Sequence, residues 1–335
     1  MPRNKEGGVL SVNKVRLSSE YKDAMVLFGG IIVLLAVMGF STRGFLSWYN
    51  MHNILKDFSI LLTVSSGMTI AILLGKIDLS AGAVMSLSAI ATTLTLRAGH
   101  NIIVGIAVGI ISGALVGLFN GYLIGVQKLN HFIATFATMS IAKGIALIAC
   151  NAQIINSTNR GLLFIGTGKI KGLFVIIWIA VIIFLILHRL LKKSSYGYKI
   201  YSTGGSETVA NLSGINTRDV YLKSFVLISV LSAIAGIFLA GKANSGNVTM
   251  GDGYEFNAIA TVLIGGTPFD GGRGGLTGTF VGALLISILR NGISFLGLTP
   301  AWQYAIIGIV ILVVIVIDVA LNEHRKAEES RRVWQ

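Results

Sequence analysis

Ten apolar runs, separated by short polar segments, occupy most of this chain of 335 residues. A helix needs about 20 apolar residues to cross the hydrocarbon core of a bilayer, and most of the runs approach that length. The runs therefore predict an all-α, polytopic membrane protein with about ten transmembrane helices. The expected spans are 24–40, 58–74, 83–97, 102–124, 131–150, 173–191, 221–241, 256–266, 277–297 and 300–320.

The composition points to the same class of protein. Hydrophobic residues make up 53% of the chain and charged residues 12%, whereas a soluble domain carries about 25% charged residues. The net charge of +13 comes from basic residues spread between the apolar runs. This distribution excludes a nucleic-acid partner and indicates contact with membrane lipid. Cys150 is the single cysteine, so no intramolecular disulfide forms.

Lys and Arg are distributed unevenly between the two sides of the expected membrane. With ten spans and a cytoplasmic start, the inner segments hold 18 of the 27 basic residues and the outer segments hold 7. This bias follows the positive-inside rule and predicts that both termini are cytoplasmic. We expect a cytoplasmic N-terminal segment (1–23), a transmembrane domain (24–320) with a cytoplasmic loop (192–220), and a cytoplasmic C-terminal tail (321–335).

Two weak sequence matches recur at nearly the same offset. The string SAIATTL at 88–94 resembles NAIATVL at 257–263, an offset of 169, and the Asn-Gly pair at 120–121 recurs at 291–292, an offset of 171. Because five spans separate the copies, their directions across the membrane are opposite. We therefore predict that spans 2–5 and 7–10 form an inverted repeat, and that the short third and eighth spans are the broken helices typical of transporters.

Two basic residues fall inside expected spans, where a charge costs roughly 2.5–3.5 kcal/mol on insertion scales. Lys143 lies near the middle of the fifth span and Arg290 in the outer half of the ninth. For Arg290 we expect the guanidinium to reach toward the outer interface. For Lys143 two interpretations remain open: it faces a polar pathway, or it pairs with a helix C-terminus or a carboxylate.

The cytoplasmic loop 192–220 contains the pattern of a short capped helix. Ser206 is suited to the N-cap and Gly214 to the left-handed position after the last turn. A two-turn amphipathic helix at this place would fit a groove on a soluble partner. The alternative is an ordinary ordered loop. The residues expected to carry the docking role are Ser206, Glu207, Ala210, Asn211 and Gly214.

Enzyme motifs are absent from the sequence. The stretch GLLFIGTGK at 161–169 resembles a phosphate-binding loop, but Ile170 stands where a Ser or Thr would hold magnesium. The five histidines are scattered along the chain, which argues against a zinc site. We therefore expect no ATP site, no metal site and no bound cofactor in this chain.

Longer motifs identify a family. The chain carries GKIDLSAG at 75–82, HFIATFAT at 131–138, GYEFNAIA at 253–260 and IGGTPFDGGRGGLTGT at 264–279. With these motifs it resembles, from about residue 45 to 318, the permease subunits of ribose-type monosaccharide ABC importers, which are relatives of the branched-chain amino-acid permeases. The sequence departs from the family pattern at several positions, so other sugars, polyols and autoinducer-2 remain open as cargo. These departures are Lys76, His131, Ala137, Ser206 and Arg290.

The resemblance implies a set of partners. A second permease copy, identical or similar, would complete one translocation path. A cytoplasmic ABC ATPase, which itself uses ATP and Mg, would dock on 206–214 of each copy, and an extracytoplasmic sugar-binding protein would deliver the solute. It also implies the bacterial inner membrane. The alternatives are a self-sufficient ion-coupled secondary transporter, which needs no docking helix, and a passive channel.

Polar residues near the expected spans are candidates for the pathway or for tight turns. Gly75 and Gly82 flank Asp78, and we expect a tight turn in which Asp78 caps the next helix. Direct contact of Asp78 with a sugar is the alternative. The complete set of candidates is Asp78, Ser80, Asn120, Lys143, Asp252, Glu255, Asn257 and Asn291.

Overall fold

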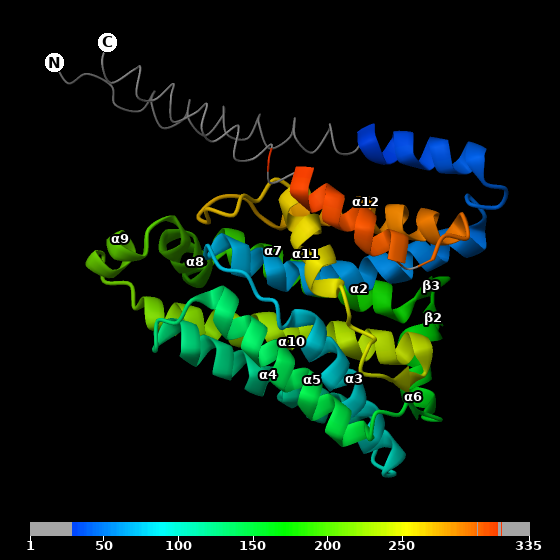
Figure 1. The fold of residues 1–335 in the computed structure, drawn as a ribbon, viewed down its shortest axis with the longest axis horizontal. Coiled ribbons are helices and arrows are strands. Elements are labelled where there is room, and N and C mark those ends of the chain that lie inside the picture. Colours follow the sequence, from blue (N-terminus) through cyan, green and yellow to red (C-terminus); the bar gives the residue numbers. More distant parts are fainter. Residues whose placement is uncertain (1–28, 300, 314–315, 317–335) are drawn as a thin grey trace.

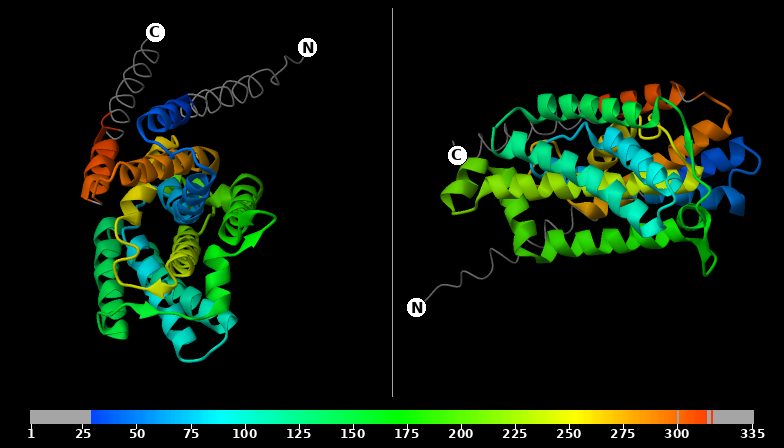
Figure 2. Two further views of the ribbon diagram at one scale, coloured as in Figure 1. Left: turned by 90° about the vertical axis from the view of Figure 1, so that its right-hand side faces the viewer. Right: turned by 90° about the horizontal axis from the view of Figure 1, so that it is seen from below.

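The structure is a computed structural model that describes residues 29–299, 301–313 and 316. The expected terminal segments 1–23 and 321–335 lie outside the described residues. Long helices run mostly along one axis of the molecule (Figures 1 and 2). The labelled helices are α2 (Trp48–Leu73), α3 (Ala81–Arg97), α4 (Ile102–Gly125), α5 (His131–Cys150), α6 (Arg160–Thr167), α7 (Val175–Lys193), α8 (Ser195–Gly205), α9 (Glu207–Leu212), α10 (Thr217–Ala243), α11 (Tyr254–Ile264) and α12 (Leu276–Phe295).

Each of the ten expected spans overlaps a helix of the described chain. Six of these helices are long and apolar enough to cross a membrane: α2, α4, α5, α7, α10 and α12. The others are shorter apolar helices, namely α3, α11, Gly29–Ser41 and Ala301–Val313. The all-α polytopic class is thus confirmed, while the number of ten spans stays a prediction.

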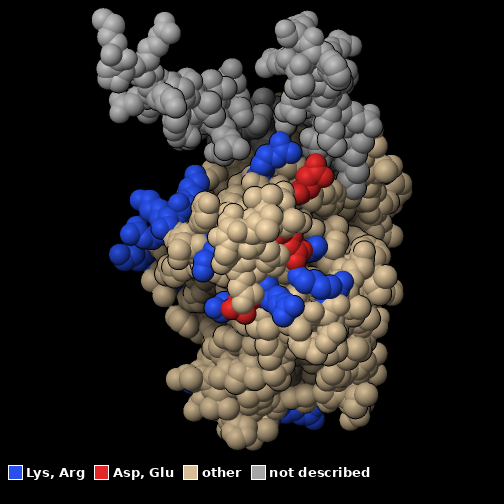
Figure 3. Space-filling model, turned by 90° about the vertical axis from the view of Figure 1, so that its left-hand side faces the viewer, with Lys and Arg blue, Asp and Glu red and all other residues tan. Residues whose placement is uncertain are grey.

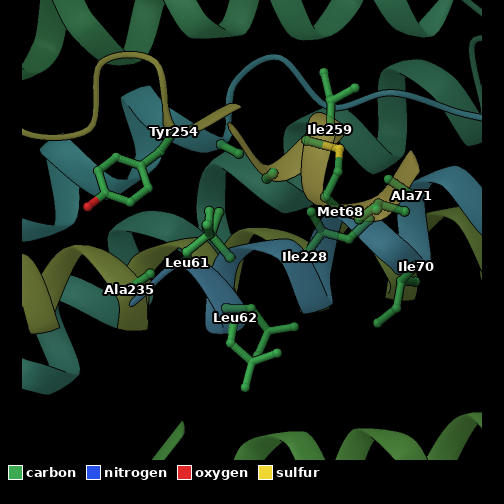
Figure 4. Packing of buried hydrophobic residues seen from close by; sticks show 14 of the residues in the cluster. Leu61, Leu62, Met68, Ile70, Ala71, Ile228, Ala235, Tyr254 and Ile259 are labelled. Carbon is green, nitrogen blue, oxygen red and sulfur yellow. The ribbon is translucent and has the colours of Figure 1, made fainter. Parts of the chain in front are cut away.

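Two helices form the centre of the molecule. α2 and α10 pack against each other and are mostly buried, whereas α4, α5 and α7 leave most of their side chains on the surface. α3 and α4 pack on α10, and α11 and α12 pack on α2. Buried apolar side chains fill the space between α2, α10 and α11, including Leu61, Met68, Ile228 and Ile259 (Figure 4). The outer helices are therefore free to face lipid or another protein.

α2 begins at Trp48, ten residues before the start expected from hydropathy at residue 58. The hydroxyl of Ser47 caps the helix by accepting the backbone N–H of Asn50. The Asn50 amide is buried and donates to the carbonyl of Phe45 at 2.8 Å. Polar residues in the first turns of α2 have partners inside the protein, so their polarity does not mark a solvent-exposed loop.

The segment 192–220 holds two helices rather than one. α9 follows Ser206 as expected, but α8 (Ser195–Gly205) was not expected. Three glycines and several polar residues lie in α8 and hide its helical pattern. The helix is nevertheless capped by Ser194, whose hydroxyl accepts the backbone N–H of Gly197 at 3.0 Å.

The stretch that resembles a phosphate-binding loop is helical, because α6 spans Arg160–Thr167. Two small antiparallel sheets lie near it. β1 (Ile155–Asn156) pairs with β4 (Ser245–Gly246), and β2 (Lys169–Ile170) pairs with β3 (Leu173–Phe174). The β2–β3 hairpin lies at the end of the molecule opposite α9 (Figure 1).

α4 carries a glycine at every fourth position from 105 to 125. Four residues make about one helical turn, so these glycines form one stripe along the helix. The stripe is buried and faces α3 at one end and α10 along the rest, where backbone and Cβ atoms approach closely. Small residues allow this kind of close packing between membrane helices. The stripe consists of Gly105, Gly109, Gly113, Gly117, Gly121 and Gly125.

Candidate functional site

α9 is capped at both ends. At its start, the Ser206 hydroxyl accepts the backbone N–H of Val209 at 3.3 Å. At its end, Gly214 has a φ of +80°, and the backbone N–H of Ile215 bonds to the carbonyl of Ala210 at 3.0 Å. This is a Schellman arrangement, which satisfies the last carbonyls of a short helix. Both caps were expected from the sequence, and the structure confirms them.

Polar side chains attach the inner side of α9 to the rest of the protein. The Glu207 carboxylate lies 2.5 Å from the Lys128 ammonium, and it accepts the Tyr221 hydroxyl at 3.1 Å. Asn211 accepts the Thr217 hydroxyl at 3.0 Å. Partial burial acts to raise the pKa of Glu207, but the hydrogen bond and charge of Lys128 lower that pKa overall. Glu207 is therefore held as a carboxylate between α9, α10 and the segment after α4.

The outer side of α9 is apolar and exposed. Leu212 is 85% exposed and Val209 is 60% exposed, and Tyr198 of α8 lies nearby at 70%. A groove of about 300 Å³ separates α8 from α9 and is lined by two of the three tyrosines of α8, Tyr198 and Tyr201. In the view of this end, Lys and Arg outnumber Asp and Glu (Figure 3). Large apolar side chains on a two-turn helix amid basic residues are suited to contact with another protein.

A second candidate site is a cavity of about 500 Å³ among α11, α12 and helix Ala301–Val313. Most of its wall is apolar, which is typical of sites that bind small molecules. Its polar groups come from all three helices and from the segment before α11. The lining residues are Asp252, Gly253, Phe256, Asn257, Arg290, Gln303, Tyr304, Ile307, Gly308 and Ile311.

Both basic residues of the expected spans lie at this cavity or beside it. The Lys143 ammonium of α5 is 2.7 Å from the Asp252 carboxylate, so pairing with a carboxylate is confirmed for this lysine. Arg290 lines the cavity, where its Nε donates to Gln303 at 3.5 Å and its guanidinium lies 4.9 Å from the centre of the Tyr254 ring. Arg290 therefore lies in a cavity between helices, and its expected reach toward the outer interface stays a prediction.

Asn257 and Glu255 belong to the first turns of α11. Asn257 is buried at the cavity wall, and its amide nitrogen donates to the carbonyl of Gly253 at 2.6 Å. Its side-chain oxygen has no hydrogen-bond partner among the described residues. The Glu255 carboxylate instead lies against Gly82 of α3, where any side chain would collide with it.

Asp78 lies in a separate network that joins three segments. Its carboxylate is fully buried and accepts the Ser80 hydroxyl at 2.6 Å and the Ser80 backbone N–H at 2.9 Å. Ser80 in turn accepts the Asn120 amide at 2.9 Å, and Asn120 accepts the Thr138 hydroxyl at 2.7 Å. We expected Asp78 to be the N-cap of α3, but the N-cap residue is Ser80. Asp78 holds Ser80 through these two bonds, although the Ser80 side chain makes no capping bond to the helix. Asp78 lines neither the cavity nor the groove described above.

Asn291 belongs to a third location. Its amide exchanges two hydrogen bonds with Asn50 of α2, at 2.8 and 3.0 Å. This reciprocal pair ties α12 to the start of α2. Each amide thereby satisfies the other, which matters most for Asn50 because its side chain is buried.

The comparisons with known proteins decide the family. Residues 50–315 match the model of a family described as the permease component of the branched-chain amino acid transport system. The chain belongs to this family. It is a transport subunit of ABC-type systems rather than an enzyme.

Several named relatives align with this permease over most of their length. The ribose import permease protein of Bacillus subtilis (strain 168) is 38% identical over 87% of this chain and 91% of its own. The ribose import permease protein of Escherichia coli (strain K12) is 32% identical over 86% of this chain and 91% of its own. The L-arabinose ABC transporter permease protein of Azospirillum brasilense is 27% identical over 88% of this chain and 87% of its own. No solved structure matches the chain.

The permease brings some predicted site residues together and leaves others apart. Asp252 and Asn257 line the cavity, with Lys143 beside them. Asp78, Ser80 and Asn120 share one network elsewhere, as described above. Gln303 and Tyr304 line the cavity but were not among the candidates. The sequence did contain a signal for them, because an amide and a phenol at the start of the last apolar run are polar groups next to an expected span.

Proposed function

We propose that this permease is the membrane-spanning subunit of an ATP-driven importer for a monosaccharide or a similar small polar solute. The observation that carries the proposal is the similarity to ribose and L-arabinose permeases over nearly the whole chain. An ion-coupled secondary transporter is less well supported, because the capped and exposed α9 has no role in such a protein. A bacterial inner membrane, with both termini cytoplasmic, follows from the charge bias and the family.

A cytoplasmic ATPase is the proposed partner of residues 206–214. The apolar side of α9 would dock on the ATPase, while the bond between Glu207 and Lys128 transmits its movement to the membrane helices. ATP and Mg would be used by that partner, and this chain would bind no cofactor. A sugar-binding protein would meet the opposite end of the molecule, where the β2–β3 hairpin lies.

A second permease copy is the proposed partner in the membrane. α5 and helix Ala301–Val313 carry large exposed apolar side chains on either side of the cavity, among them Phe136, Ile141, Trp302 and Ile309. If these faces meet in a homodimer or heterodimer, the two cavities open toward a shared path. The work of the permease is then to expose this path alternately to each side of the membrane.

An inverted repeat of the second to fifth and seventh to tenth spans is supported by the helix boundaries. A shift of about 170 residues carries α2 onto α10, α3 onto α11 and α4 onto α12. The packing is repeated in the same way. α3 and α4 contact each other and α10, and their counterparts α11 and α12 contact each other and α2. Gly82 and Gly251, which are 169 residues apart, approach each other so closely that a Cβ on either would collide with the other's backbone.

The test is reconstitution of the permease into proteoliposomes with its co-purifying ATPase and binding protein. We expect uptake of radiolabelled ribose or arabinose that requires ATP and both partners. Ion-gradient-driven uptake by the purified chain alone would contradict the proposal, and so would flux without any energy source.

The docking role of α9 has its own test in the same assay. Glu207→Arg and Gly214→Pro are expected to abolish ATP-driven uptake without changing membrane insertion. The matched control is the charge-swapped pair Lys128→Glu with Glu207→Arg, which should recover uptake because it restores the ion pair. Normal uptake in both single variants would remove the docking role.

A further inference from the structure

Arg290 is a charged group inside the membrane domain without a carboxylate partner in the described part of the chain. A guanidinium carries five N–H donors, yet the contacts of this one are a hydrogen bond of 3.5 Å to Gln303 and the face of the Tyr254 ring. Charges in membrane spans are costly and are normally paired or turned toward a polar cavity. Arg290 lines the cavity between α11, α12 and helix Ala301–Val313, so its donors are available there.

The other charges at this cavity compensate each other. Asp252 lines the wall and is paired with Lys143 at 2.7 Å. Glu255 is buried against Gly82 and is not part of the wall. The described wall therefore has one uncompensated positive charge, that of Arg290.

Asn257 supplies an independent observation. It is only 4% exposed, it lines the same cavity, and its side-chain oxygen has no partner among the described residues. Leaving a buried acceptor unsatisfied costs about 1–3 kcal/mol. A hydroxyl group of a bound molecule would satisfy this oxygen. The cavity is thus lined by a fixed cation and by an asparagine whose buried acceptor is unsatisfied.

We infer that this cavity binds a sugar derivative that carries an anionic group, a carboxylate or a phosphate, with the anion at Arg290 and a hydroxyl at Asn257. The inference rests on the proposed import function and adds an anionic derivative to the neutral sugars expected as cargo. A volume of about 500 Å³ is sufficient for one such molecule. The remaining wall, which includes Phe256, Ile307 and Ile311, presents apolar surface to the sugar ring.

The test compares two probes that differ in a single group. D-galacturonate and D-galactose share the same ring, but only the first has a carboxylate at C6. Equilibrium binding of each is measured on the full-length permease in nanodiscs of phosphatidylcholine. Because charge-assisted hydrogen bonds are about twice as strong as neutral ones, we expect galacturonate to bind at least about tenfold more tightly.

Substitutions assign the preference to the two residues. Arg290→Gln should weaken galacturonate binding far more than galactose binding and so remove the preference, whereas Arg290→Lys should keep part of the preference. Asn257→Ala should weaken the binding of both probes. The matched control is Arg97→Gln, because Arg97 is exposed at the end of α3 and does not line the cavity. Its binding of both probes should equal that of the native chain.

Three results would overturn the inference. They are equal binding of the two probes to the native chain, an equal loss of binding of both probes in Arg290→Gln, and occupation of the cavity by a lipid headgroup. The last is tested with nanodiscs that contain phosphatidylglycerol. If this lipid is retained in an Arg290-dependent manner and abolishes galacturonate binding, the headgroup is the ligand. Failure of the inference is separable from failure of the import function, because ATP-driven uptake of a neutral sugar would be unaffected.

Discussion

The ion pair between Lys143 and Asp252 links α5 to the segment before α11. Both side chains are about one-third exposed, and partly exposed ion pairs have coupling energies of up to about 1 kcal/mol. We predict that Lys143→Asp lowers the thermal unfolding midpoint of the purified permease by a few degrees, because it places two carboxylates side by side. Adding Asp252→Lys should restore most of the loss. An unfolding midpoint that does not recover in the double variant would show that the two residues are not coupled.

Glu207 should make the position of α9 sensitive to acid. Its pKa in the folded protein is lowered by Lys128, so its contribution to stability is complete above the ordinary carboxyl pKa of about 4.3 and is lost as the pH falls through the lower folded pKa. We predict that a spin label at Val209→Cys, in a Cys150→Ala background, becomes more mobile as the pH falls below about 4.3.

The control for this titration is Glu207→Gln. In that variant the label should already be mobile at neutral pH, because the ion pair with Lys128 is absent, and acid should change nothing further. A label whose mobility responds equally to acid in both proteins would assign the effect to another group.

At the residue scale, local interactions were predictable and distant ones were not. The caps at Ser206 and Gly214 follow from residues within one short segment, so the sequence was sufficient to predict them. The partner of Lys143 lies 109 residues away, at Asp252. Which side chains meet across an all-apolar bundle depends on how each helix is rotated, and hydrophobic periodicity does not reveal rotation when every face is apolar.

The glycine stripe of α4 determines how closely that helix packs on α10. A Cβ at Gly117 would lie 2.5 Å from the carbonyl oxygen of Phe225 and 2.7 Å from the Cβ of Ser229. We predict that Gly117→Ala destabilises the permease by about 1–3 kcal/mol, because overpacking forces the two backbones apart. The measurement is the unfolding midpoint in detergent, together with the yield of folded protein.

Gly144 of α5 provides the matched control for this substitution. It also lies in an apolar helix, but a Cβ there would meet no atom within 4 Å. Gly144→Ala should therefore leave the midpoint unchanged or raise it slightly, since alanine favours the helix more than glycine does. Equal destabilisation by both substitutions would mean that close packing at α4 is not the cause.

At the scale of elements, each span expected from hydropathy overlaps a helix, but hydropathy misjudged the segments whose polar residues are satisfied inside the protein. The early start of α2 depends on Ser47 and on the buried Asn50, and no measure of hydrophobicity registers such partners. α8 was missed because its three glycines and its hydroxyl groups weaken the helical pattern. The six glycines of α4, in contrast, were visible in the sequence at regular intervals and could have predicted its buried face.

At the scale of the whole molecule, the two ends carry different elements. The end with α8 and α9 exposes basic residues and apolar side chains of a short helix (Figure 3). The opposite end carries the β2–β3 hairpin (Figure 1). By the positive-inside rule, we propose that the first end faces the cytoplasm. This proposed orientation rests on the charges and on no contact in the interior.

Orientation can be measured with single cysteines, because Cys150 is the one native cysteine and is buried. Leu212→Cys places a thiol on α9 and Ile170→Cys places one on the hairpin, at positions that are 85% and 46% exposed. In right-side-out vesicles, a membrane-impermeant maleimide should label Ile170→Cys and leave Leu212→Cys unmodified. In inverted vesicles the pattern should reverse. Labelling of α9 from outside the cell would place the proposed ATPase contact on the wrong side, and the import mechanism built on α9 would then fail whatever solute the cavity binds.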